Sequence, residues 1–183
     1  MRRILLLTAL LAIMHTVSMA QSKSSSAFNS GDNLFNVGIG LGSPFFGAGY
    51  SSSIPVNPTI SYEKGVTDVI SVGGILSYAS SKYNFDNADA FKESAVYVGV
   101  RGSYHFGQAL QLGDKVDLYG GASVGYVVVS VSDNESTFTG AASTAGFGLF
   151  GGIKYYFQPT IGVYAEAGYE SLSFLNVGVA FKF

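Results

Sequence analysis

Apolar side chains alternate with small or polar ones along most of the chain, from Asn33 to Phe183. A period of two is typical of β-strands whose two faces meet different surroundings. Clusters of turn residues divide this region into segments of about ten residues, the length of a strand that spans a membrane. The pattern predicts eight strands, over residues 33–42, 56–64, 69–80, 93–106, 116–129, 143–157, 161–170 and 173–183.

The two faces of these predicted strands differ in size and charge. Val98 and Val100 share one face of segment 93–106, and Gly99 and Arg101 share the other. The apolar face is free of charge at the strand centres, whereas the other face is mostly Gly and Ser. An eight-stranded interior is only just wide enough for side chains, so the bulky face would overfill it. We therefore expect an all-β protein, an eight-stranded antiparallel up-and-down transmembrane β-barrel with its apolar face toward lipid, and not a soluble barrel.

Aromatic residues of the apolar face fall near the predicted strand ends, which predicts a girdle at each membrane interface. If the N-terminus is periplasmic, the inner girdle is Phe35, Tyr62, Tyr104, Phe106, Tyr155, Phe157, Phe181 and Phe183, and the outer one is Tyr78, Tyr126 and Tyr169. The links 65–68 and 158–160 are short, as periplasmic turns should be, although 107–115 is longer. Outer loops are then expected at 43–55, 81–92 and 130–142.

The start of the chain, residues 1–20, has the features of an export signal. Two arginines precede an apolar run over 4–14, and small residues precede the expected cleavage site after Ala20. A run of about eleven residues is too short for a spanning helix, which needs about 20, so cleavage is favoured over an uncleaved anchor. We then expect a flexible Ser-rich segment at 21–32, with little that could be buried, and one barrel domain at 33–183.

Composition narrows the function classes further. Charged residues are 12% of the 183 residues, against a usual share of about 25%, so the surface is not an ordinary water-facing one. The net charge of −2 offers no positive field to a phosphate backbone, which disfavours nucleic-acid binding. Cys is 0, which excludes disulfides, thiolate metal ligands and a Cys nucleophile.

Inward charges form the candidate site. Arg101 and Glu166 are expected at similar depth in the lumen, with Asp117, Lys154 and Glu63 nearer the periplasmic end. A charge in a narrow lumen must be paired, because burial without a partner is costly. We expect these five residues, together with inward tyrosines, to form an ion-pair network that plugs the barrel. A gated ion path is the alternative.

Catalytic chemistry has little support. Some eight-stranded barrels of outer membranes are lipid A enzymes, whose sites need a base and a nucleophile toward the outer leaflet. The sole His after the predicted signal, His105, is placed inward at the periplasmic end of its strand. We expect no enzymatic activity, no cofactor and no metal site. The aromatic residues Phe45, Phe46 and Tyr50 of the first outer loop either pack over the barrel mouth, which is favoured, or grip a ligand.

Two segments carry a resemblance to a known family: Val163-Tyr164-Ala165-Glu166-Ala167-Gly168-Tyr169 and the ending Val177-Gly178-Val179-Ala180-Phe181-Lys182-Phe183. With the alternating segments, they resemble small Gram-negative outer-membrane barrels of the OmpA transmembrane-domain and OmpX type, and most of all the short outer membrane beta-barrel domain proteins of the Bacteroidetes. The resemblance covers about residues 33–183. It implies that Phe183, with Phe181 before it, is the signal read by the barrel-assembly machinery.

These observations lead to two expectations of different class. The first is a monomer in the cell outer membrane, in contact with its lipid and lipopolysaccharide, with a structural or adhesive role at the cell surface. The second is a narrow porin-like channel, or a receptor or transporter for a small or apolar ligand. Inward rings such as Phe150 and Tyr97 favour a plugged lumen and hence the first. The sequence names no surface ligand.

Overall fold

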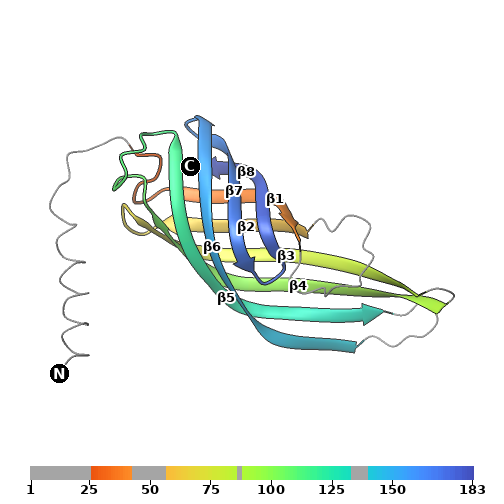
Figure 1. Ribbon diagram of the computed structural model, residues 1–183. Coiled ribbons are helices and arrows are strands. Elements are labelled where there is room, and N and C mark those ends of the chain that lie inside the picture. Colours follow the sequence, from red (N-terminus) through yellow and green to blue (C-terminus); the bar gives the residue numbers. More distant parts are fainter. Residues whose placement is uncertain (1–25, 43–56, 86–87, 133–139) are drawn as a thin grey trace, which may run out of the picture.

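Eight strands form one closed antiparallel barrel in the computed structural model, which describes residues 26–42, 57–85, 88–132 and 140–183 (Figure 1). The strands are β1 Asn33–Leu41, β2 Asn57–Gly65, β3 Ile70–Phe85, β4 Ala88–His105, β5 Val116–Ser132, β6 Gly140–Gln158, β7 Ile161–Glu170 and β8 Ser173–Lys182. Each strand pairs with the next along the chain, and β8 returns to β1. The predicted up-and-down barrel is confirmed. Among the residues described, there is no helix long and apolar enough to cross a membrane.

The barrel closes between its first and last strands. Phe35 lies opposite Phe181 in this pairing, and the backbones of Asn33 and Phe183 exchange two hydrogen bonds at its end. The Asn33 N–H donates to the Phe183 carbonyl at 2.7 Å, and the Phe183 N–H donates to the Asn33 carbonyl at 3.0 Å. Because the β1–β8 ladder runs the length of β1, no sheet edge is left open at this seam.

The two ends of the barrel carry different connections. One end, here called the termini end, holds both ends of the described chain and the links 66–69, 106–115 and 159–160 (Figure 1). The opposite end, here called the loop end, holds the remaining four links. The grouping of connections at two ends is the one the sequence predicts.

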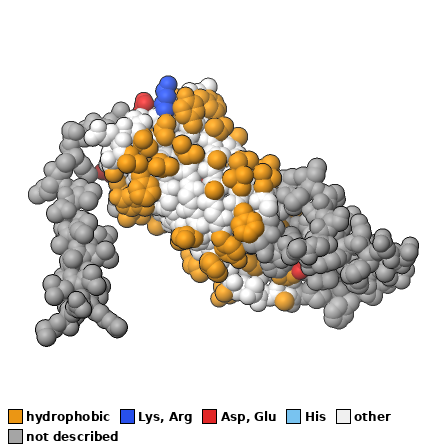
Figure 2. Space-filling view, viewed as in Figure 1, with side chains coloured by type: hydrophobic (Ala, Val, Ile, Leu, Met, Phe, Trp, Pro, Cys, Tyr) orange, Lys and Arg blue, Asp and Glu red, His pale blue; other side chains and the backbone are white. Residues whose placement is uncertain are grey.

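Exposure alternates along the strands. On β4, Val98 and Val100 are 52% and 63% exposed, whereas Tyr97 and Arg101 are 0% and 3% exposed. Figure 2 shows apolar side chains over the visible face of the barrel, with the visible charged side chains near its ends. The predicted faces are therefore confirmed: small, polar and charged residues face the lumen, and bulky apolar residues face outward.

Side chains fill the lumen, and inward glycines make room for them. A Cβ atom on Gly152 would lie 2.6 Å from the ring of Tyr119 and 2.8 Å from the Cγ atom of Glu166. Such distances are shorter than real Cβ contacts, so glycine is required at this position. Toward the loop end, a second group fills the lumen with apolar contacts: Ile75, Ala79, Ala95, Tyr97, Val127 and Leu172. The interior is a packed core, as expected for eight strands.

Four strands are longer than the sequence pattern predicts. The pairing of β3 with β4 continues to Phe85 and Ala88, and that of β5 with β6 continues to Val131 and Gly140. Most of the expected loop 81–92 and part of the loop 130–142 are therefore strand, which corrects the prediction. Beyond the apolar belt both faces of a strand meet water, so the alternation fades while the backbone ladder continues. Figure 1 shows β3–β6 running past the rest of the barrel.

Residues 26–32, here called the N-terminal segment, cover the termini end of the lumen. Ala27 and Phe28 are buried, and the Lys182 ammonium donates a hydrogen bond to the Ala27 carbonyl at 2.6 Å. The expectation of a flexible segment with little to bury is wrong for these two residues, because one ring and one methyl group fill the mouth of a narrow barrel. The first part of that segment, 21–25, lies outside the described residues.

Candidate functional site in the barrel lumen

Arg101 of β4 is the centre of a buried charged cluster. Its Nη2 atom lies 2.7 Å from Glu166 Oε1 on β7, and its Nε atom lies 3.0 Å from Glu63 Oε1 on β2. Its Nη1 atom lies 3.5 Å from Glu170 Oε1, also on β7. The guanidinium carbon lies 4.1 Å from the centre of the Phe150 ring on β6. Because β2, β4 and β7 are not neighbours in the barrel, Arg101 ties separate walls together across the lumen.

Glu170 was not among the site residues expected from the sequence. It stands four positions after Glu166, so a period of two puts both carboxylates on the same face of β7. That spacing was the signal that could have revealed it. The alternation reaches Glu170 through Gly168, whose φ of 155° accompanies a register shift between β7 and β8.

Neutral side chains complete the contacts of the two β7 carboxylates. The Tyr119 hydroxyl donates to Glu166 Oε1 at 2.9 Å, and the Asn176 amide donates to Glu170 Oε2 at 3.0 Å. The Ser173 hydroxyl donates to Asn176 Oδ1 at 2.8 Å. A buried carboxylate needs hydrogen-bond donors to offset the loss of water. The donors to Glu166 and Glu170 come from two different strands, β5 and β8.

His105 joins a second chain of polar contacts at the termini end of β4. Its Nδ1 atom lies 2.9 Å from both carboxylate oxygens of Asp117 on β5. Its Nε2 atom lies 2.9 Å from the Ser71 hydroxyl oxygen on β3. Ser71 donates its proton to Glu63 Oε2 at 2.7 Å. The chain Asp117–His105–Ser71–Glu63, here called the His105 chain, therefore connects the Arg101 cluster to the termini end of the lumen.

The contacts within the His105 chain resemble those of a catalytic triad, in which a serine nucleophile, a histidine base and an orienting acid follow one another. Ser71, His105 and Asp117 have this order but cannot take these roles. The Ser71 hydroxyl has one proton, and it is directed at Glu63 Oε2 and not at the His105 Nε2 atom. All of these side chains are buried. A nucleophile must be reached by substrate and must give its proton to the base, and neither condition is met here. The contacts support a structural role.

Lys154 and Asp117 stand opposite each other on β6 and β5 but have different partners. Asp117 contacts His105, whereas the Lys154 ammonium lies 4.5 Å from the centre of the Tyr119 ring. Lys154 Nζ has no hydrogen-bond acceptor within the described part of the chain. Of the five expected network residues, the structure thus brings Arg101, Glu166 and Glu63 into contact and places the other two beside them.

The remaining predicted features lie outside the lumen. Phe181 faces outward, with its ring centroid 6.4 Å from that of Phe35, and the terminal ring of Phe183 is 69% exposed. An exposed terminal ring is accessible to another protein, and its role as an assembly signal remains a prediction. The loop residues Phe45, Phe46 and Tyr50 fall in a part of the chain that the structure does not describe. Within the described ranges, no group of three or more side chains could hold a metal ion.

The closed barrel, its apolar outer face and its filled lumen define a small integral barrel of an outer membrane. The family of the outer membrane protein beta-barrel domain matches residues 6–183, and the chain belongs to that family. A search of curated proteins finds no significant match.

Solved structures share the fold at low sequence identity. One is Ail, the attachment invasion locus protein of Yersinia pestis, in complex with the heparin analogue sucrose octasulfate: 14% identity over 84% of this chain and 99% of that chain, with a TM-score of 0.54. Another is the N-terminal β-barrel domain of Pseudomonas aeruginosa OprF: 19% identity over 85% of this chain and 99% of that chain, with a TM-score of 0.51. At these identities the likeness concerns the fold alone.

Proposed function

We propose that this protein is a plugged outer-membrane barrel with a structural or surface-interaction role and no enzymatic activity. The observation that carries this proposal is the sheet formed by the far parts of β3–β6. Among the described strands, residues 140–147 of β6 pair with β5 alone, because pairing with β7 begins at Gly148. Residues 79–85 of β3 pair with β4 alone among the described strands, because the described pairing with β2 ends before them. Among the described residues, the four-stranded sheet therefore projects from the barrel, and no described strand pairs with its two outer sides.

The two outer sides give this sheet a means of recognition. Each edge presents backbone N–H and C=O groups with no neighbour among the described strands, and an extended polypeptide can add to such an edge by main-chain hydrogen bonds. On β6, the side chains of residues 142–145 are exposed beside this edge. The name of Ail places one protein of similar fold in attachment and invasion, which agrees with a surface role.

The filled lumen supports a plug over the second candidate, a narrow channel or a receptor for a small or apolar ligand. The Arg101 cluster closes the centre of the barrel, and Phe28 closes its termini end. Charges that bind one another and exclude water hold the walls together and leave little room for a permeant ion. No observation on the described residues favours the channel.

The difference between the two ends of the barrel supports one orientation in the membrane. We propose that the termini end lies in the periplasm and the loop end outside, because such barrels extend further on the outer side and here β3–β6 run past the barrel at the loop end. Export would then end with cleavage after Ala20, and the barrel-assembly machinery would read Phe183. The protein would sit as a monomer in outer-membrane lipid, with lipopolysaccharide around its loop end.

Single-channel recording in planar bilayers tests the plug. The purified barrel should give no discrete current steps, and a reproducible conductance would favour the channel.

The surface role is tested with a phage-displayed library of random peptides. The test variant joins Ala79 to Ala95 and Val129 to Ala142 by Asn-Gly turns, which removes the projecting sheet. Peptides enriched on the wild-type protein should not bind this variant, and equal binding, or no enrichment at all, would contradict a role for the sheet.

A further inference from the structure

Outward glycines differ from inward glycines in their surroundings. At Gly74 of β3, a Cβ atom would contact only the Gly99 carbonyl oxygen, at the ordinary distance of 3.5 Å. Packing within the barrel therefore does not require glycine there, in contrast to Gly152. Glycine weakens a strand, and inside a strand it often marks a place where another molecule approaches the backbone closely. We therefore looked for what Gly74 leaves open.

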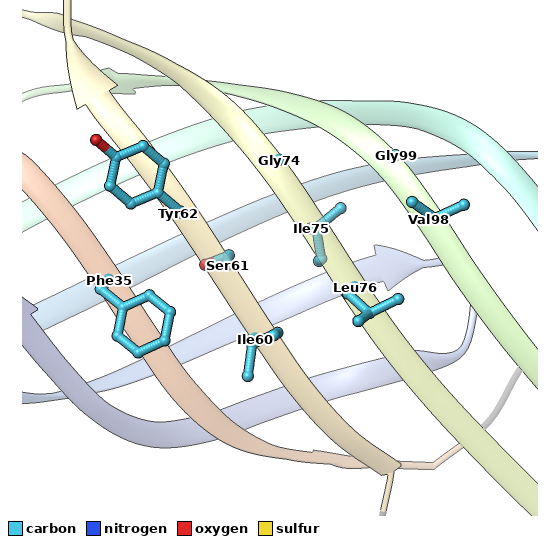
Figure 3. Close-up of a pocket in the computed structure, with 9 residues that line it drawn as sticks. All are labelled: Phe35, Ile60, Ser61, Tyr62, Gly74, Ile75, Leu76, Val98 and Gly99. Carbon is cyan, nitrogen blue, oxygen red and sulfur yellow. The ribbon is translucent and has the colours of Figure 1, made fainter.

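A hollow of about 310 Å³ lies over Gly74 in the outward surface of β1–β4 (Figure 3). Its walls are apolar and are formed by the side chains of Phe35, Ile60, Tyr62, Leu76 and Val98. Tyr62 is the residue opposite Gly74 in the β2–β3 pairing. In Figure 3 the bare backbone of Gly74 lies between Tyr62 and Val98. The hollow is therefore an apolar groove within the face that the family fold turns toward lipid.

The positively charged side chain of Lys64 lies at the termini end of this hollow. Lys64 occupies the next outward position after Tyr62 on β2 and lies opposite Val72 of β3. It is exposed and forms no ion pair with any described residue. The Tyr62 hydroxyl donates to Asn33 Oδ1 at 2.7 Å, so polar groups gather at the same end. Basic and aromatic side chains at the end of a membrane-spanning segment lie at the level of lipid headgroups, where anionic phosphates are found.

We propose that this hollow binds a phospholipid of the leaflet at the termini end, with one acyl chain over Gly74 and the phosphate against Lys64. A thin, flexible chain can reach the floor of the hollow and gains dispersion contacts that a smooth wall does not offer. The convex face of a second barrel would be held away from that floor by Tyr62 and Val98, which project on either side. The proposal goes beyond the surface role and does not depend on it, because it concerns the opposite part of the barrel.

Native mass spectrometry of the protein purified from outer membranes in mild detergent tests the site. Phosphatidylglycerol and phosphatidylethanolamine are added as the two probes. The wild type should retain one phospholipid, and Gly74→Leu, which covers the floor of the hollow, should lower this occupancy about threefold or more, because the acyl chain loses its contacts with the floor. Lys64→Gln should lower the preference for the anionic lipid about fivefold, the effect of removing one interfacial cation.

Gly120→Leu is the matched control. Gly120 of β5 also faces outward with room for a Cβ atom, whose nearest contact would be the Phe150 carbonyl oxygen at 3.6 Å, and it does not line the hollow. This variant should retain lipid, and resistance of the unheated protein to SDS shows that each variant is folded. Equal retention by wild type and Gly74→Leu would overturn the proposal, as would equal loss in Gly120→Leu. A wild-type dimer that Gly74→Leu converts to a monomer would assign the hollow to a second copy instead.

Discussion

The ring of Phe28 lies face to face with the imidazole of His105, with ring centroids 3.6 Å apart and planes inclined by 12°. Phe28 belongs to the N-terminal segment, and His105 ends β4. The contact therefore joins the start of the described chain to the barrel interior and covers the His105 chain from the termini end. Buried polar groups are stable only while their hydrogen-bond partners stay in place. By covering the His105 chain, Phe28 shields these hydrogen bonds from water.

Replacing Phe28 should therefore destabilise the barrel. Phe28→Ala removes a buried ring and opens the His105 chain to water, with an expected loss of about 3 kcal/mol in the free energy of unfolding. Urea unfolding in detergent measures this loss. Val66→Ala is the control, because Val66 lies at the same end but is exposed. A loss for Phe28→Ala as small as that of the control would show that the N-terminal segment is not part of the folded core.

Arg101 and Glu166 should contribute unequally, because Arg101 serves three carboxylates while Glu166 is one of three around Arg101. Arg101→Leu leaves Glu63, Glu166 and Glu170 without their shared cation and should cost about 3 to 5 kcal/mol. Glu166→Leu leaves Arg101 with two carboxylates and should cost less. The double variant should cost less than the sum of the two single changes.

Urea unfolding of the three variants, together with bilayer current, separates a plug from a gated path. A plug predicts the unequal and non-additive losses, since the residues share one network. Small, additive losses of stability combined with raised current in each single variant would show instead that these residues line a constriction for ions.

The sequence predicted part of this cluster and missed the rest for physical reasons. Arg101 and Glu166 could be placed together because both stand at inward positions of strands whose register follows from alternation. Glu170 obeys the same rule and could have been included. The contact of Phe28 with His105 could not be predicted, because it depends on the path of a segment that has no periodicity. The length of β3–β6 was underestimated because backbone pairing, unlike the apolar alternation, leaves little trace in the sequence.

Lys154 should contribute less to stability than Arg101 although both are buried. Its ammonium has no hydrogen-bond acceptor among the described residues and lies against the ring of Tyr119. Removing a charge that is poorly compensated recovers its desolvation cost, so Lys154→Met should change the free energy of unfolding by less than about 1 kcal/mol. The same urea titration measures this change. A loss as large as that of Arg101→Leu would show that Lys154 is a full member of the network.

The outward face can be tested at Val98, which lies on the exposed side of β4. Val98→Arg puts a charge near the bilayer midplane and should cost about 2 to 4 kcal/mol when unfolding is measured in lipid vesicles. The neighbouring inward position is not a suitable control: a Cβ atom on Gly99 would lie 2.8 Å from the Tyr97 hydroxyl, so Gly99→Ser should itself cost about 1 to 3 kcal/mol through overpacking. Thr59→Ser, which keeps a buried inward hydroxyl, should cost about 1 kcal/mol or less. Similar losses for Val98→Arg and Thr59→Ser would contradict the assigned faces.

Phe183 combines two contributions that the structure makes separable. Its backbone completes the β1–β8 seam with Asn33, whereas its ring is exposed. Deleting Phe183 removes both contributions, while Phe183→Ala removes the ring and keeps the seam.

If the ring is the signal for assembly, both variants should show less heat-modifiable barrel in outer membranes, with export and cleavage unchanged. Only the deletion should then refold poorly in detergent, where no assembly machinery is present, because it lacks the two seam hydrogen bonds. A normal amount of folded barrel in cells that express Phe183→Ala would show that the terminal ring is not read, and would leave the seam as the reason for any defect of the deletion.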